Sequence, residues 1–125
     1  MQSDSLTPSS LYQQCLDKQR IVVCGTRGTT SLATLLVNVL QYYKRPVDFS
    51  LNAPLHGMTE TVRLSDAHIV VIDGKEKDLH EYHHHVGVIT NILWNTSMEV
   101  GTEEEYVKFF EHFADSTPKG GMLFY

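Results

Sequence analysis

The sequence is short of several residue types, and each shortage excludes a class of protein. Lysine and arginine number only 10 against 15 acidic residues, so the net charge is -5 and no basic stripe can meet nucleic-acid phosphates. No apolar run is long enough to span a bilayer. The polar segment 1–10 lacks the cationic and apolar stretches of a signal peptide. We therefore expect neither a nucleic acid nor a membrane as a partner.

Cysteine is scarce too. The two cysteines are Cys15 and Cys24, and Cys24 closes an apolar segment that reads as a buried strand. No general base stands beside it in the sequence, which favours a buried free thiol over a catalytic one. Unpaired thiols favour a reducing, cytoplasmic compartment.

The length and composition indicate one globular domain. The chain has 125 residues, of which 42% are hydrophobic and 20% are charged. Segment 1–10 is predicted to be a flexible arm, although Pro8 could start a short helix reaching about Asp17. Residues 11–125 are predicted to form the domain.

Short apolar segments alternate with helical patterns along the chain. Because these segments show little alternation of polar and apolar residues, they predict a three-layer α/β/α fold with a mainly parallel sheet buried on both faces. A loop is expected over 52–63, and a surface loop or a single helical turn over 75–85. The expected strands are Arg20–Cys24, Val47–Leu51, His68–Ile72, Val86–Ile92 and Met122–Tyr125.

Two segments carry clear helical patterns. The first is 29–43, and the second opens with a capping box formed by Thr102 and Glu105. Apolar residues at helical spacing predict one buried face on each helix. For the first helix these residues are Leu32, Leu35, Leu36, Val39, Leu40 and Tyr43; for the second they are Tyr106, Phe109, Phe110 and Phe113.

A turn bracketed by glycines links the first predicted strand to the first long helix. Glycines let a ligand approach the backbone closely, and the N–H groups at a helix start attract anions, so the turn predicts a phosphate-binding loop. A phosphate loop carries lysine directly after its last glycine, and here that position holds Thr29. The candidate residues are Gly25, Thr26, Arg27, Gly28, Thr29, Thr30 and Ser31.

Two further segments follow strand ends. They are 73–76 and 91–96, and the loop at 25–31 makes a third. Ligands of parallel sheets bind beyond the carboxyl ends of the strands, so these three segments should meet at one edge.

With these segments placed, the chain resembles the central ATP-binding domain of the Mur ligases, the ATP-dependent amide ligases of peptidoglycan synthesis. The likeness is greatest to the branch of the muramate–alanine and murein-tripeptide ligases. The loop Gly-Thr-Arg-Gly-Thr-Thr-Ser at 25–31 resembles the family's Gly-Thr-His/Ser-Gly-Lys-Thr-Thr. Residues 62–74 resemble the segment that ends at the family's magnesium-binding glutamate, and 88–96 resemble its Thr-Asn-Ile-x-x-Asp-His run.

The resemblance implies specific roles. It implies ATP and magnesium as cofactors, Asn91 as a contact to the nucleotide base, and Thr30 and Asp73 as magnesium ligands. Residues 103–121 match the helix and the Pro-x-Gly-Gly turn that follow in the family. The competing interpretation of Asp73 is an Asp-Gly turn at a strand end.

The chain also departs from the family. Thr29 replaces the loop lysine, and Asn95 and Thr96 replace the Asp-His pair. We therefore expect weakened or lost ATP binding and no ligase activity, in a cut-down central domain that stands without the family's UDP-binding and C-terminal domains. The alternatives are a degenerate nucleotide-binding or regulatory module that takes ATP or another small anion, and a protein-interaction module that pairs with a second copy or a partner.

Histidines gather in one short segment, at His80, His83, His84 and His85. Imidazole is a common metal ligand, which suggests a structural zinc site. The alternative is a solvated loop that leads into the following strand.

Overall fold

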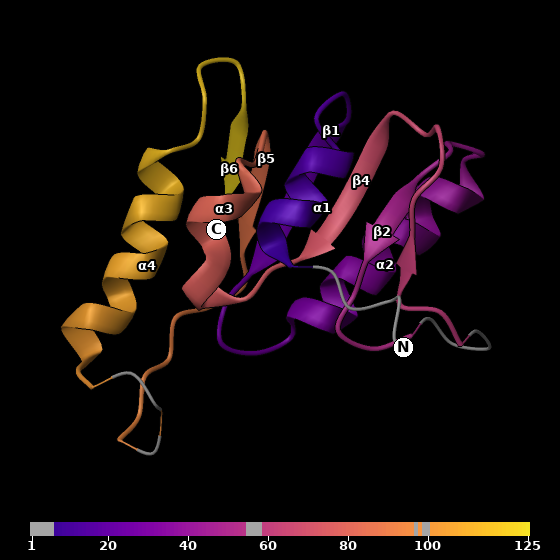
Figure 1. Cartoon of the computed structure of the whole chain (residues 1–125). Helices are drawn as coiled ribbons and strands as arrows, with labels where there is room; N and C mark the ends of the chain where they lie inside the picture. The colour runs from indigo at the N-terminus through magenta and orange to yellow at the C-terminus, as the bar shows by residue number, and fades with distance from the viewer. Residues whose placement is uncertain (1–6, 55–58, 97, 99–100) are drawn as a thin grey trace.

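The computed structural model describes residues 7–54, 59–96, 98 and 101–125. These residues form a 6-stranded sheet in the order β3-β2-β4-β1-β5-β6 (Figure 1). All neighbouring strands run parallel except β2 and β3, which are antiparallel. The strands are β1 (Gln19–Cys24), β2 (Asp48–Ser50), β3 (Val62–Arg63), β4 (Ile69–Asp73), β5 (Val86–Ile89) and β6 (Met122–Phe124).

Helices cover both faces of this sheet, as the sequence predicted. Successive residues of the central strands alternate between two cores: Val22 packs with α1, α3 and α4, whereas Val23 packs with α2. Figure 1 shows α1, α3 and α4 side by side in front of the sheet. The helices are α1 (Pro8–Gln14), α2 (Thr29–Tyr42), α3 (Leu79–Tyr82, preceded by a 3-10 turn at Glu76–Asp78) and α4 (Glu103–Asp115). None of the helices in the described part of the chain is long and apolar enough to cross a membrane.

The helix starts follow local chemistry. The Thr102 hydroxyl accepts from the Glu105 N–H at 3.1 Å, which confirms the capping box that opens α4. The Thr7 hydroxyl accepts from the Ser10 N–H at 3.1 Å, and Pro8 stands at the first position of α1. The helix α1 begins at Pro8, as predicted, and ends at Gln14 rather than near Asp17. Its start lies within the segment that we assigned to a flexible arm, and residues 1–6 of that segment lie outside the described residues.

The prediction for the buried face of α2 was partly wrong. Ala33 and Val37 are its fully buried residues, while Leu35 and Val39 are exposed. Tyr43, also assigned to that face, follows the helix and is exposed. The reason is that apolar residues almost encircle α2, so the pattern fixes the helix but not its rotation about its own axis.

Three other elements depart from the expectations. The strand expected over 86–92 ends at Ile89, where its pairing with Cys24 of β1 stops. The segment expected to be a loop over 52–63 ends in the two-residue strand β3, and residues 55–58 within it lie outside the described residues. The polar segment 75–85 contains a single α-helical turn, α3, as one alternative predicted, but its Leu79 and Tyr82 are buried against the sheet core. A strand of two residues and a helix of four are too short to give a periodic signal.

The connections on either side of β1 lead to opposite faces of the sheet. The chain leaves β1 toward α2 on one face, and leaves the neighbouring β4 toward α3 on the other face. In sheets of this kind, ligands bind beyond the carboxyl ends of adjacent parallel strands that connect to opposite faces. The segments after β1, β4 and β5 all emerge at this edge, which we call the loop edge.

Candidate functional site

The turn after β1 has the backbone of an anion-binding loop. Gly25 has φ 144° and Gly28 has φ 82°, conformations that favour glycine. Gly28 is the N-cap residue of α2, and it has no side chain with which to cap the helix. The N–H groups of the first helical turn have no partner within a helix, so those of Thr29, Thr30 and Ser31 can donate to an anion.

Residues after β5 hold this loop in place. The Thr26 N–H donates to the Asn91 carbonyl at 3.0 Å, and the Arg27 N–H donates to Asn91 Oδ1 at 3.1 Å. The Arg27 carbonyl accepts from Asn91 Nδ2 at 3.1 Å and from the Thr90 hydroxyl at 2.8 Å. A side chain on Gly25 would collide with the Thr90 hydroxyl, so the segments at 25–27 and 90–91 fit only because Gly25 is glycine.

The loop is also tied to α4. The hydroxyls of Thr26 and Tyr106 lie 2.7 Å apart, and the Thr26 hydroxyl accepts from the Leu93 N–H at 2.8 Å. Helical spacing identified Tyr106 as a core residue, and it is 1% exposed, but the spacing did not predict this contact. The available signal was the hydroxyl itself, because a buried tyrosine needs a hydrogen-bond partner.

Asp73 ends β4 and lies against the first turn of α2. Its Oδ2 accepts from the Thr30 hydroxyl at 2.5 Å and from the Asn52 N–H at 3.2 Å. Its Oδ1 is buried and has no hydrogen-bond partner among the described residues. A buried carboxylate oxygen without a donor is costly. Hard cations such as magnesium prefer oxygen ligands of this kind.

Thus the structure brings together the three segments that the sequence singled out. Thr30 and Asp73 are in direct contact, and Asn91 contacts the loop through Arg27. The Arg27 side chain is exposed, and Thr29 is half-buried. Neither Thr90 nor Asn52 was singled out as a site residue.

Known proteins share this fold. The crystal structure of UDP-N-acetylmuramate:L-alanyl-gamma-D-glutamyl-meso-diaminopimelate ligase from Neisseria meningitides matches 93% of this chain and 42% of that chain, with a TM-score of 0.83. Its sequence identity is 18%, so this match establishes the fold alone.

Sequence comparison identifies relatives along nearly the whole chain. UDP-N-acetylmuramate–L-alanine ligase from Rhodococcus erythropolis is 30% identical over 120 residues, which cover 94% of this chain and 24% of that enzyme. The ligases of the same name from Nocardia farcinica and Mycobacterium tuberculosis are each 28% identical over 120 residues. The chain is related to the Mur ligases. The resemblance read from the sequence is therefore confirmed, although no family model matches the chain. The chain spans about a quarter of the length of these curated relatives.

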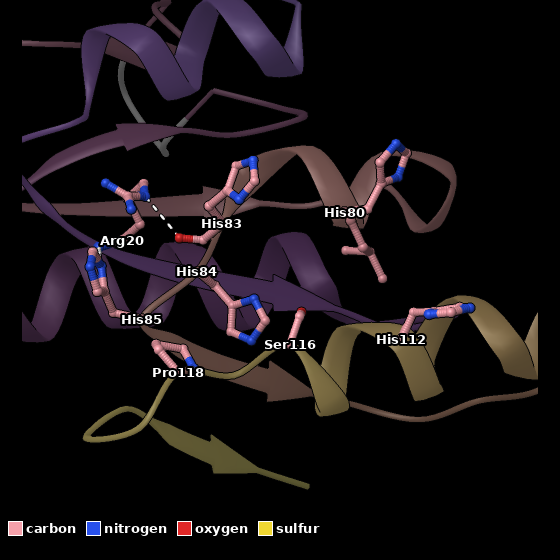
Figure 2. Close-up of a pocket in the computed structure, with 9 residues that line it drawn as sticks. Arg20, His80, His83, His84, His85, His112, Ser116 and Pro118 are labelled. Atoms are coloured by element: carbon pink, nitrogen blue, oxygen red, sulfur yellow. Dashed lines mark hydrogen bonds between the residues drawn. The ribbon is translucent and has the colours of Figure 1, made fainter.

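This Mur ligase relative has a second polar cluster at the opposite edge of the sheet, where β1 and β5 begin. A hollow of about 450 Å³ lies there, lined by Arg20, Leu79, His80, His83, His84, His85, His112, Ser116 and Pro118. Figure 2 shows its imidazoles spread around the hollow rather than converging on one point. Within the described residues, no three histidine, cysteine, aspartate or glutamate side chains are placed to hold a metal ion. We call this region the histidine edge.

Most polar groups at the histidine edge are already paired. The Arg20 guanidinium is buried and donates to the carbonyls of Cys15, Leu16, Lys18 and His83, the last of which is drawn in Figure 2. His85 Nδ1 accepts from the Arg20 N–H at 3.0 Å.

His84 shows that the prediction of a solvated loop was wrong at this position. It is 2% exposed, stacks on Phe113 and bonds to Thr117 at 2.8 Å. Burial, helped by nearby His85 and Arg20, lowers the pKa of His84 to about 4.

Among the described residues, the cysteines contribute only backbone carbonyls to the two clusters, and their thiols take no part. Both are free and buried, as the sequence indicated for Cys24. Burial raises the pKa of the Cys24 thiol to about 12, so it stays protonated at neutral pH and is a poor nucleophile.

Proposed function

We propose that this chain is a Mur-ligase-like domain that binds magnesium and the phosphates of a nucleotide at the loop edge, and that it does not catalyse ligation by itself. The observation that carries the proposal is Asp73 Oδ1, which has no partner among the described residues, on a carboxylate that bonds to Thr30 at the glycine-capped start of α2. A helix start supplies donors for an anion, and a buried carboxylate oxygen supplies a ligand for a cation.

The residues present fit a magnesium ion. Asp73 and the Thr30 hydroxyl are oxygen ligands, which this ion prefers, and magnesium completes its shell with water and phosphate oxygens. When bound, the ion would neutralise phosphate charge next to the carboxylate. Asp73 and Thr30 would orient that charge toward the first turn of α2.

The residues fit the phosphate groups less well. The N–H groups of Thr29, Thr30 and Ser31 are available, but Thr29 supplies no cation. A lost charge-assisted contact costs ~1.5–3 kcal/mol, which is roughly a 10–150-fold loss of affinity. We therefore propose weak binding, with ATP as the nucleotide that the family relationship suggests.

We propose the absence of ligation from the residues at three family motif positions. Two curated relatives are named as enzymes that join L-alanine to UDP-N-acetylmuramate. In this chain Thr29, Asn95 and Thr96 stand where the family motifs carry a lysine and an Asp-His pair. Turnover of ATP that depends on a muramyl substrate and an amino acid would contradict this part of the proposal.

Isothermal titration with magnesium and ATP tests the binding. Thr29→Lys should strengthen binding by roughly 10–150-fold, because it restores the missing charge-assisted contact. Asp73→Asn should abolish the dependence on magnesium while leaving the fold intact, since it removes the charge and keeps the shape. Asn38→Ala, on the exposed side of α2, is the matched control and should change nothing.

The outcome that removes the proposal is equally definite. If neither the natural chain nor Thr29→Lys binds at millimolar nucleotide, while both remain folded by circular dichroism, the loop edge is not a nucleotide site.

A protein-interaction module is the second candidate, and exposed apolar side chains favour it. Tyr42 is 79% exposed and Leu35 is 54% exposed on α2, while Met122 and Phe124 are about half exposed on β6. Exposed apolar groups on neighbouring positions mark surfaces that associate. Sedimentation at high concentration should then reveal self-association, which Phe124→Ser should weaken; a monomer throughout would contradict pairing between copies.

A further inference from the structure

The family resemblance implies that Asn91 contacts the nucleotide base, but in the structure its side chain bonds to the loop. Both ends of the amide meet the backbone of Arg27: Oδ1 accepts from the N–H and Nδ2 donates to the carbonyl, each at 3.1 Å. The two partners fix which end is oxygen, because an N–H group needs an acceptor and a carbonyl needs a donor.

Thr90 strengthens the same contact. Its hydroxyl donates to the Arg27 carbonyl at 2.8 Å, and its backbone N–H donates to the Cys24 carbonyl at 2.9 Å. The end of β5 therefore holds the turn after β1 at several points, although the two segments are more than 60 residues apart in sequence.

These contacts set the direction of one peptide group. In a trans peptide the N–H points opposite to the carbonyl, so fixing the Arg27 carbonyl on Thr90 and Asn91 turns the Gly28 N–H away from β5. The sheet order places β4, which carries Asp73, on the other side of β1 from β5. A flipped peptide would instead present a carbonyl oxygen to a phosphate, which repels it.

The turn needs such a restraint. Gly25 and Gly28 can each adopt many conformations, and ordering a residue upon binding costs free energy. We propose that Thr90 and Asn91 are positioning residues that hold the loop ready for phosphate, so that Asn91 acts on nucleotide binding through the loop and not through the base. This inference rests on the proposed nucleotide site.

The first experiment needs no ligand. Amide hydrogen exchange should show protection of the Arg27 N–H in the natural chain, and Asn91→Ala should reduce that protection by about 10-fold or more, the value of one lost hydrogen bond. Asn38→Ala, an exposed asparagine of α2, is the matched control and should leave Arg27 unchanged. Unaltered protection in Asn91→Ala would overturn the proposal.

The second experiment separates the loop from the base. With magnesium present, Asn91→Ala should weaken the binding of ATP and of inorganic tripolyphosphate by the same factor, about 10-fold, because both ligands contact the loop. Thr90→Val keeps the branched shape and removes the hydroxyl, and it should also weaken the binding of both ligands. If Asn91→Ala weakens the binding of ATP but not of tripolyphosphate, Asn91 contacts the base and the inference is overturned.

The two experiments also separate the two proposals. Should the natural chain bind neither ligand, the nucleotide site is rejected, and with it any action of Asn91 on binding. The exchange result then decides independently whether Asn91 orders the loop.

Discussion

The two edges of the sheet each gather polar side chains, and they differ in what those groups still lack. At the histidine edge, Arg20 and His85 are satisfied by protein atoms around a hollow of about 450 Å³. At the loop edge, the helix α2 is capped by a glycine, and Asp73 Oδ1 has no partner among the described residues. The comparison teaches that a hollow can be lined by polar groups whose hydrogen bonds are already satisfied, and this is why we place the proposed function at the loop edge.

The largest expected effect comes from one substitution made at both edges. Arg20→Met should cost about 3 kcal/mol or more of unfolding free energy, because several buried carbonyls lose their donor. Arg27→Met, at an exposed arginine of the loop, should change stability by less than ~0.5 kcal/mol. Urea denaturation measures both variants.

If the two arginine substitutions lowered the unfolding free energy equally, the proposed difference between the two edges would be contradicted. Arg27→Met should instead weaken nucleotide binding a few-fold, because it removes a positive charge from the phosphate side, and titration calorimetry measures that change.

A smaller effect is expected from acid at the histidine edge. His84 has a pKa of about 4 in the fold against an ordinary 6.5, so the unfolded chain binds more protons between these values. Stability should be full above pH 6.5 and should fall by up to about 3 kcal/mol as pH drops toward 4. His84→Gln should remove most of this dependence, as measured by urea midpoints across that range.

Two controls sharpen this prediction. Asn38→Ala changes an exposed side chain that carries no titratable group and should leave the pH dependence as it was. Asp48 loses its contribution only at lower pH: burial alone would raise its pKa, but bonds from Ser65 and Lys18 lower it below the ordinary 3.8. A profile that is flat between pH 6.5 and 4 in the natural chain would contradict the assignment of His84 as a buried neutral group.

Sequence patterns were most informative where one physical cause dominates. The apolar segment at β1, the glycines after it and the capping box before α4 each have a local cause, and each lies where it was expected. The meeting of Thr30 with Asp73 also followed from parallel strands, which bring their carboxyl ends to one edge.

Patterns failed where distant partners decide the outcome. The burial of His84 depends on Phe113 and on Gly87, whose missing side chain leaves room for both rings. The contact between Tyr106 and Thr26 joins residues that are 80 positions apart. Nothing in the local sequence around any of these residues specifies its partner.

The central position of β1 has a consequence for the order in which the protein folds during synthesis. This strand is translated before its two parallel neighbours β4 and β5, which begin at Ile69 and Val86. Contacts this distant in sequence form slowly, and domains fold once their last partner is available. The loop at 25–31 can therefore take its final shape only after Thr90 and Asn91 have left the ribosome.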